Sequence, residues 1–208
     1  MKRKIFTLMF LLAFLAMGTS PGIAVTVTKP FVVSATIPSA TGISITATRV
    51  TSSNNQFGAQ VSALDFNPMV FNALNSIWLP DHYFAIDVGS TGGAGSPNVT
   101  VTYGSETNPT GQVKGLGFKS TANFVLVKGA TGSQTETPLT AHGPKKLLKS
   151  LTGENITATE LASGFLRVYV GVFPGDDTAI LTAGGEPFTN ADKPGTYQGT
   201  LTVSATVP

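Results

Sequence analysis

Few residues of this chain could carry acid–base chemistry, and they lie apart. His82 and His142 are the two histidines, the side chains that titrate near neutral pH. His82 stands beside Asp81 in "PDHYFAIDVG", but Asp87 would face the opposite side of a predicted strand. After residue 24 the sequence also has no G-x-S-x-G nucleophile elbow. We therefore expect structural or exposed histidines and no enzyme activity, with a serine–histidine–aspartate triad built from distant segments as a minor alternative.

Two short motifs could bind ligands. "GGAG" at Gly92–Gly95 follows a predicted strand, as phosphate loops do, but it lacks the Lys-Ser/Thr ending of such loops. Asp176 and Asp177 in "PGDDT" could offer oxygens to Ca²⁺. Turn aspartates more commonly bond their own backbone. We therefore expect a hairpin loop and a turn, with no cofactor and no metal.

The aromatic composition bears on sugar binding. The chain has one tryptophan, Trp78, and four tyrosines, whereas phenylalanine is the dominant aromatic residue with 13 copies. Phenylalanine has no polar handle and usually enters the core. This composition weakens the case for a secreted ligand- or carbohydrate-binding module, which stays the alternative function.

Cysteine is absent from the sequence, which excludes thiol catalysis, disulfides and thiolate metal sites. The formal net charge of +2 falls to −1 without the three cations of Lys2–Lys4. A nearly neutral chain lacks the electrostatic footprint of a nucleic-acid-binding protein. We interpret the one basic cluster, "GPKKLLKSL", as a solvated face.

The first 24 residues are typical of an export signal. Lys2–Lys4 is positively charged, and the apolar run Ile5–Met17 is too short for a membrane span. We expect cleavage after Ala24, with Gly18 as the alternative site and an uncleaved anchor as the other interpretation. Residues 25–208 would then form a single domain without a membrane span, in the periplasm, on the cell surface or outside the cell.

Alternating apolar and polar residues between glycines and prolines predict strands through most of the mature chain. Long helices do not recur between them, so we expect an all-β, immunoglobulin-like antiparallel sandwich with little helix. The predicted strands are 25–28, 31–37, 43–50, 60–66, 83–89, 98–104, 117–129, 165–173 and 197–207.

Two regions are harder to interpret. The apolar residues of "PMVFNALNSIWLP" (Pro68–Pro80) fit a helical stripe and equally a loop over one end of the sandwich. Residues 129–164 are expected to form a long loop or insertion, with a helical turn or two in "PKKLLKSL" and another turn in "ATELASG".

The last strand raises the question of assembly. "YQGTLTVSATV" alternates cleanly and contains neither a charge nor a proline. A long uncharged edge strand is a template for pairing with another chain unless the fold covers it. We therefore expect this strand either to be covered within the fold or to be used for assembly.

These residues resemble a known family. "PGTYQGTLTVSATV" is similar to the C-terminal strand of spore coat protein U-like and other pilin-like secreted β-sandwich proteins, and "FVVSATIPSATGISITATRV" with "ALDFNPM" is similar to their opening strands. Val207 stands where chaperone–usher pilins carry tyrosine, and the disulfide of many relatives is missing. The resemblance implies a sandwich that is incomplete or exposes an edge, and it implies partners among copies of the chain, other surface subunits or a periplasmic chaperone.

We therefore predict a structural subunit of a surface appendage, coat or extracellular matrix, which forms an oligomer or polymer by β-strand addition. The alternative is that residues 25–37 form the first strand of their own sandwich. The predicted donor residues are Val25, Val27, Phe31 and Val33, and the predicted acceptor residues are Leu201, Val203, Ala205 and Val207.

Overall fold

The computed structural model describes residues 32–36, 42–90, 95–129, 139–162 and 164–207; of residues 32–36 and Leu139 it describes the backbone alone. The strands are β1 (Val32–Thr36), β2 (Ile43–Thr51), β3 (Gln56–Val61), β4 (Met69–Asn72), β5 (Ile77–Pro80), β6 (His82–Ser90), β7 (Asn98–Thr107), β8 (Ser120–Lys128), β9 (Leu139–Ala141), β10 (Lys146–Leu147), β11 (Thr152–Ile156), β12 (Gly164–Val172), β13 (Phe188–Thr189) and β14 (Gln198–Thr206). The helices are α2 (Leu116–Lys119), α3 (Thr178–Thr182) and the 3-10 helix η1 (Leu148–Ser150).

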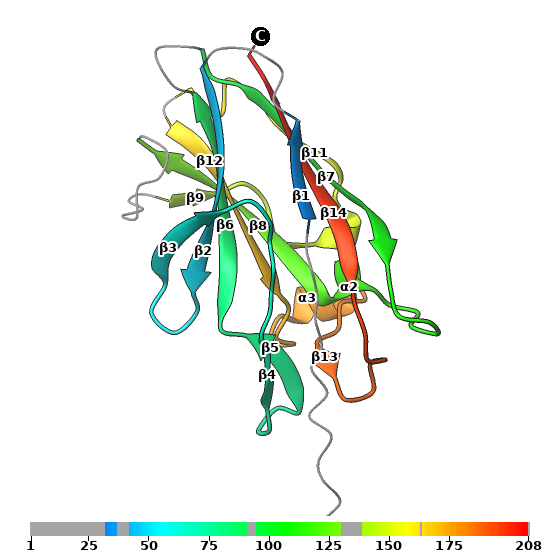
Figure 1. The fold of residues 1–208 in the computed structure, drawn as a ribbon. Coiled ribbons are helices and arrows are strands. Elements are labelled where there is room, and N and C mark those ends of the chain that lie inside the picture. The colour runs from blue at the N-terminus through cyan, green and yellow to red at the C-terminus, as the bar shows by residue number, and fades with distance from the viewer. Residues whose placement is uncertain (1–31, 37–41, 91–94, 130–138, 163, 208) are drawn as a thin grey trace, which may run out of the picture.

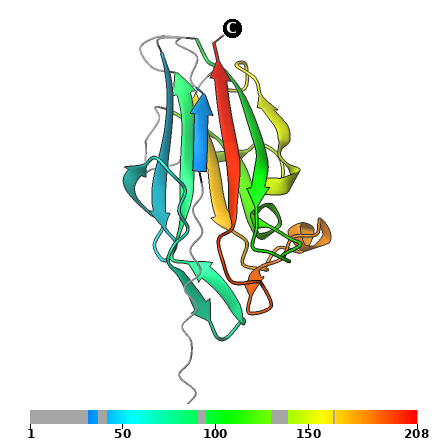
Figure 2. The same ribbon diagram turned by 45° about the vertical axis from the view of Figure 1, so that its right-hand side comes forward.

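Two large sheets pack face to face, and a third small sheet lies at one end of the molecule (Figures 1 and 2). The first sheet has the strand order β1-β14-β7-β11, and the second has the order β10-β8-β12-β6-β2-β3, with β9 added beside β8. All pairs are antiparallel except β1 with β14, which is parallel. The predicted all-β sandwich with little helix is therefore confirmed.

The alternation of the sequence explains how the strands face the core. In β14, every second residue from Gly199 to Ala205 is buried, and the residues between them are partly exposed. The central strand β12 is buried on both faces: Leu166, Val168 and Val170 point into the sandwich, whereas Arg167 lies on the opposite side. β12 therefore forms part of a second, smaller cluster on the outer face of its sheet.

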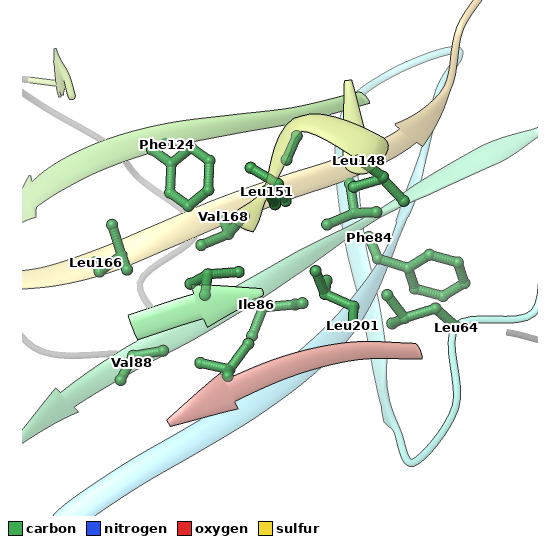
Figure 3. Packing of buried hydrophobic residues seen from close by; sticks show 14 of the residues in the cluster. Leu64, Phe84, Ile86, Val88, Phe124, Leu148, Leu151, Leu166, Val168 and Leu201 are labelled. Carbon is green, nitrogen blue, oxygen red and sulfur yellow. The ribbon is translucent and has the colours of Figure 1, made fainter. Parts of the chain in front are cut away.

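The core fills the space between the two large sheets (Figure 3). Phe84, Ile86 and Val88 of β6 and Phe124 of β8 meet Leu201 of β14 there, and all of them are at most 1% exposed. The segment around η1 closes one side of the core with further leucines. A core of this size in one sandwich lets a cysteine-free chain fold without disulfides.

The stretch from Pro68 to Pro80 forms neither a helix nor a loop but the hairpin β4–β5, to which β13 pairs. Phe71 and Trp78 are cross-strand partners whose ring centroids lie 5.1 Å apart. The Asn72 side chain accepts hydrogen bonds from the backbone of Leu74 and Asn75, which stabilises the turn.

Three other predicted elements differ in detail. The strand predicted at 117–129 begins as the helix α2, which continues into β8 at Ser120. The strand predicted to end at Phe66 ends at Val61, and farther along the chain Asp65 accepts a hydrogen bond from the Asn67 backbone in a turn. Residues 129–164 are not one long loop where they are described, since they contribute strands to both large sheets through β9, β10 and β11.

Candidate functional site

The predicted assembly strands come together at one edge of the first sheet. β1 pairs with β14 in parallel, with Val33 opposite Leu201 and Ser34 opposite Thr202. Figure 2 shows β1 alongside β14, at the end of the first sheet. The predicted donor residues Val25, Val27 and Phe31 lie outside the described residues.

The acceptor side chains do not form an open surface. Leu201, Val203 and Ala205 are at most 1% exposed and belong to the core, and Val207 follows the end of β14 and is partly exposed. β14 lies between β1 and β7, so its edge is covered within the chain. β1 itself is the edge strand, and β14 would become the edge if β1 left.

His82 is held as a structural residue. Its ring is buried, with Nδ1 2.6 Å from Asp81 Oδ1 and Nε2 2.8 Å from the Asp65 carbonyl oxygen. The hydrogen bond with His82 is the main cause of the lowered pKa of Asp81, to which Arg49 adds a salt bridge. Both ring nitrogens therefore have partners, which fits the expectation of a structural histidine.

The other residues considered for chemistry have structural partners too. His142 Nδ1 lies 3.2 Å from Glu160 Oε1. The indole of Trp78 donates to the Asn190 side chain at 2.8 Å, so this ring supports the hairpin. Asp177 caps α3 by accepting from the backbone of Ala179 and Ile180, which is the turn role expected for it.

A buried ion pair crosses the outer face of the second sheet. Arg167 is fully buried, with Nε 2.5 Å from Asp87 Oδ1 and Nη2 2.7 Å from Asp87 Oδ2. The guanidinium carbon lies 4.5 Å from the ring centroid of Phe57 and 5.2 Å from that of Phe165. This bidentate pair between neighbouring strands β6 and β12 fixes their register and leaves no free base for chemistry at Asp87.

A cluster of charged side chains surrounds Lys119, a residue that no sequence motif singled out. Its side chain is 1% exposed, and Nζ lies 2.8 Å from Glu186 Oε1, 2.7 Å from Asp192 Oδ1 and 3.3 Å from the Pro187 carbonyl oxygen. The ammonium nitrogen also lies 5.1 Å from the ring centroid of Phe188. We call Lys119, Glu186 and Asp192 the Lys119 cluster.

The backbone holds this cluster in place. Lys119 ends α2, and its carbonyl oxygen accepts from the Phe173 backbone at 2.8 Å. The Glu186 backbone donates to the Phe118 carbonyl oxygen at 3.1 Å. The Thr189 backbone donates to Asp192 Oδ2 at 2.7 Å, which closes the turn after β13. Two segments far apart in the sequence, the end of α2 and residues 186–192, therefore meet at the Lys119 ammonium.

Charge and burial oppose each other at the cluster. Burial disfavours ionisation of Glu186, but hydrogen bonds from Lys119 and Lys114 outweigh it and lower the Glu186 pKa. Nearby, burial raises the pKa of Tyr197, and the charges of Asp192 and Glu186 raise it further. A hollow of about 430 Å³ lies against the cluster and is lined by Lys119, Glu186 and Asp192 among others.

The described residues form neither a metal-binding cluster nor a helix that could span a membrane. Within the described part of the chain, no three histidine, aspartate or glutamate side chains gather closely enough to hold a metal ion. None of the helices that the structure describes is long and apolar enough to cross a membrane. Gly92 and Gly93 of the predicted phosphate-like loop lie outside the described residues.

Comparison with known proteins found no match for this chain among protein-family models, curated proteins or solved structures. The resemblance of the closing strand to pilin-like proteins therefore stays a prediction.

Proposed function

We propose that the protein is an exported structural subunit of a surface appendage, coat or extracellular matrix, which assembles by exchanging β1 between copies. The observation that supports this most directly is the place of β1: it is a five-residue edge strand, paired in parallel with β14. In strand exchange, β1 of one copy would pair with β14 of another copy in place of its own β14.

The chemistry of β14 suits such an exchange. The strand carries no charge, and if β1 left, β14 would be an uncharged edge with free backbone groups, which readily accepts another strand. Backbone hydrogen bonds would supply affinity, and the alternation of side chains would fix the register. Because the donor and acceptor surfaces differ, the contact is heterologous, and repetition gives an open filament.

Electron microscopy of the purified chain lacking residues 1–24 tests this function. We expect filaments in negative stain, and a ladder of oligomers in unheated gel samples that collapses to one band on boiling. The ladder would collapse because strand exchange is held by hydrogen bonds and burial without covalent links between copies. A uniform monomer over a wide range of protein concentration would contradict the proposal.

A further inference from the structure

We propose that the Lys119 cluster is a self-modifying site, in which Lys119 Nζ and Asp192 Cγ form an amide bond with loss of one water molecule. Glu186 would be the catalytic residue that carries the proton. This intramolecular cross-link does not rest on the assembly proposed above, since it would form equally in a monomer.

The reacting groups are already in contact. Lys119 Nζ lies 2.7 Å from Asp192 Oδ1 and 2.8 Å from Glu186 Oε1, so the nucleophile touches both the carboxyl group and the proton carrier. Holding the reactants in contact turns an encounter between two molecules into a step within one molecule. The entropic cost of that encounter, which is a large part of the barrier to amide formation in water, is then already met.

The amine of this reaction is withdrawn from water. The Lys119 side chain is 1% exposed and lies beneath Phe188, whose ring packs edge-on against buried Tyr197 at 5.1 Å between centroids. This burial keeps water away from the amine, so the reaction would take place in a water-poor environment where electrostatic interactions are strong.

The other ion pairs of the described residues lack this combination. Lys114, Lys145 and Lys146 each pair with one carboxylate, and their side chains are 31–38% exposed. The Arg167–Asp87 pair is as deeply buried, but a guanidinium stays protonated and is no nucleophile. Burial, two carboxylates and an amine therefore coincide at Lys119.

The step balances without a further reactant. A proton passes from Lys119 Nζ to Asp192 Oδ1, and the freed lone pair attacks Cγ while the C=O electrons move to Oδ2. The Thr189 N–H, 2.7 Å from Oδ2, would stabilise that oxyanion. Glu186 then takes a proton from Nζ and delivers it to Oδ1; the Cγ–Oδ1 bond breaks, water leaves with its electron pair, and the amide carbonyl re-forms.

Gln112 is a positioning residue for the leaving oxygen. Its Nε2 donates to Asp192 Oδ1 at 2.9 Å, so it holds the oxygen that departs as water. The hollow of about 430 Å³ is lined by both Gln112 and Asp192 and offers the water a path out. The product would tie the end of α2 to the turn after β13, in a chain that has no cysteine for a disulfide.

Intact-mass spectrometry of the purified full-length or signal-cleaved protein tests the proposal. With the N-terminus determined, we expect a mass lower than the sequence mass by one water molecule, and a tryptic peptide pair joined between Lys119 and Asp192. A mass equal to the full sequence mass, without loss of water, would overturn the proposal. A loss of water that maps to any other residue would overturn it too.

Variants assign the roles. Lys119→Met, Asp192→Ala and Glu186→Gln should each restore the full sequence mass, whereas the matched control Lys146→Met should retain the loss of water. Retention of the cross-link in Glu186→Gln would overturn the role of Glu186. Because Lys119→Met could fail to fold, the mass of the unsubstituted protein decides the question by itself.

Discussion

Arg167 illustrates how a charged side chain can belong to the interior of this sandwich. The sequence placed it in the middle of the apolar strand 165–173, where alternation alone predicts a position on the outer face. The structure covers that face with aromatic rings and pairs the guanidinium with Asp87 on the next strand. The pairing of Arg167 with Asp87 could not be predicted from spacing, because β6 and β12 are distant in the sequence.

Arg167→Met should therefore destabilise the protein strongly. The substitution deprives Asp87 of its guanidinium while that carboxylate stays 4% exposed, and breaking such a buried pair costs about 3–5 kcal/mol of unfolding free energy. Urea denaturation measures the change. Arg49→Met is the matched control, since the Arg49–Asp81 pair is exposed and should contribute only about 0–1 kcal/mol. Equal losses in both variants would contradict this interpretation of Arg167.

The Lys119 cluster was missed for a similar reason. Lys119 follows "LGF" in a segment predicted as strand, and Asp192 lies in a polar turn, so neither carries a local signal. A lysine inside a segment predicted as strand was the one hint available. Its two carboxylate partners become neighbours only when the turn after β13 folds against α2.

At the scale of elements, alternation was the reliable signal. It predicted β2, β6, β7, β12 and β14 closely, because each has one face in the core. It failed at 68–80, where Phe71, Leu74 and Trp78 repeat at helical spacing, although Phe71 and Trp78 face each other across a hairpin. Asn72, Asn75 and Ser76 are the turn-forming residues that could have predicted the hairpin. Ser76 adopts a φ of 55° in its turn.

Removing β1 should separate folding from assembly. A chain that starts at Ile37 loses one edge strand, at about 0.5–1.5 kcal/mol for each ladder hydrogen bond, but keeps the core pairing of β14 with β7. We expect a folded monomer by circular dichroism and size-exclusion chromatography. A synthetic peptide of residues 25–37 should bind it, and one with Ser34→Pro should bind more weakly. Polymerisation of the truncated chain would contradict the donor role of β1.

At the scale of the whole molecule, the sandwich has one core between its two large sheets, and β1 lies at the edge of the first sheet. β14 pairs with its antiparallel neighbour β7 along its whole length. β1, a short strand near the N-terminus, pairs with the other edge of β14. The fold class could be predicted from the sequence, but the parallel direction of this pairing could not, since alternation is the same in both directions. Whether the pairing forms within or between copies decides the proposed function.

Cysteine cross-linking between two differently substituted chains tests this most directly, because the protein has no cysteine of its own. Ser34→Cys is placed in one chain and Thr202→Cys in another, at positions that are partners in the β1–β14 register. The matched control for the second chain is Thr152→Cys, which lies on the same row of the sheet, beyond Thr102 of β7.

Strand exchange predicts that the mixed chains, assembled together and oxidised, give a disulfide-linked dimer of Ser34→Cys with Thr202→Cys and none with Thr152→Cys. If the cross-link forms only within a single chain that carries both Ser34→Cys and Thr202→Cys, β1 pairs with its own β14, and assembly by strand exchange is contradicted.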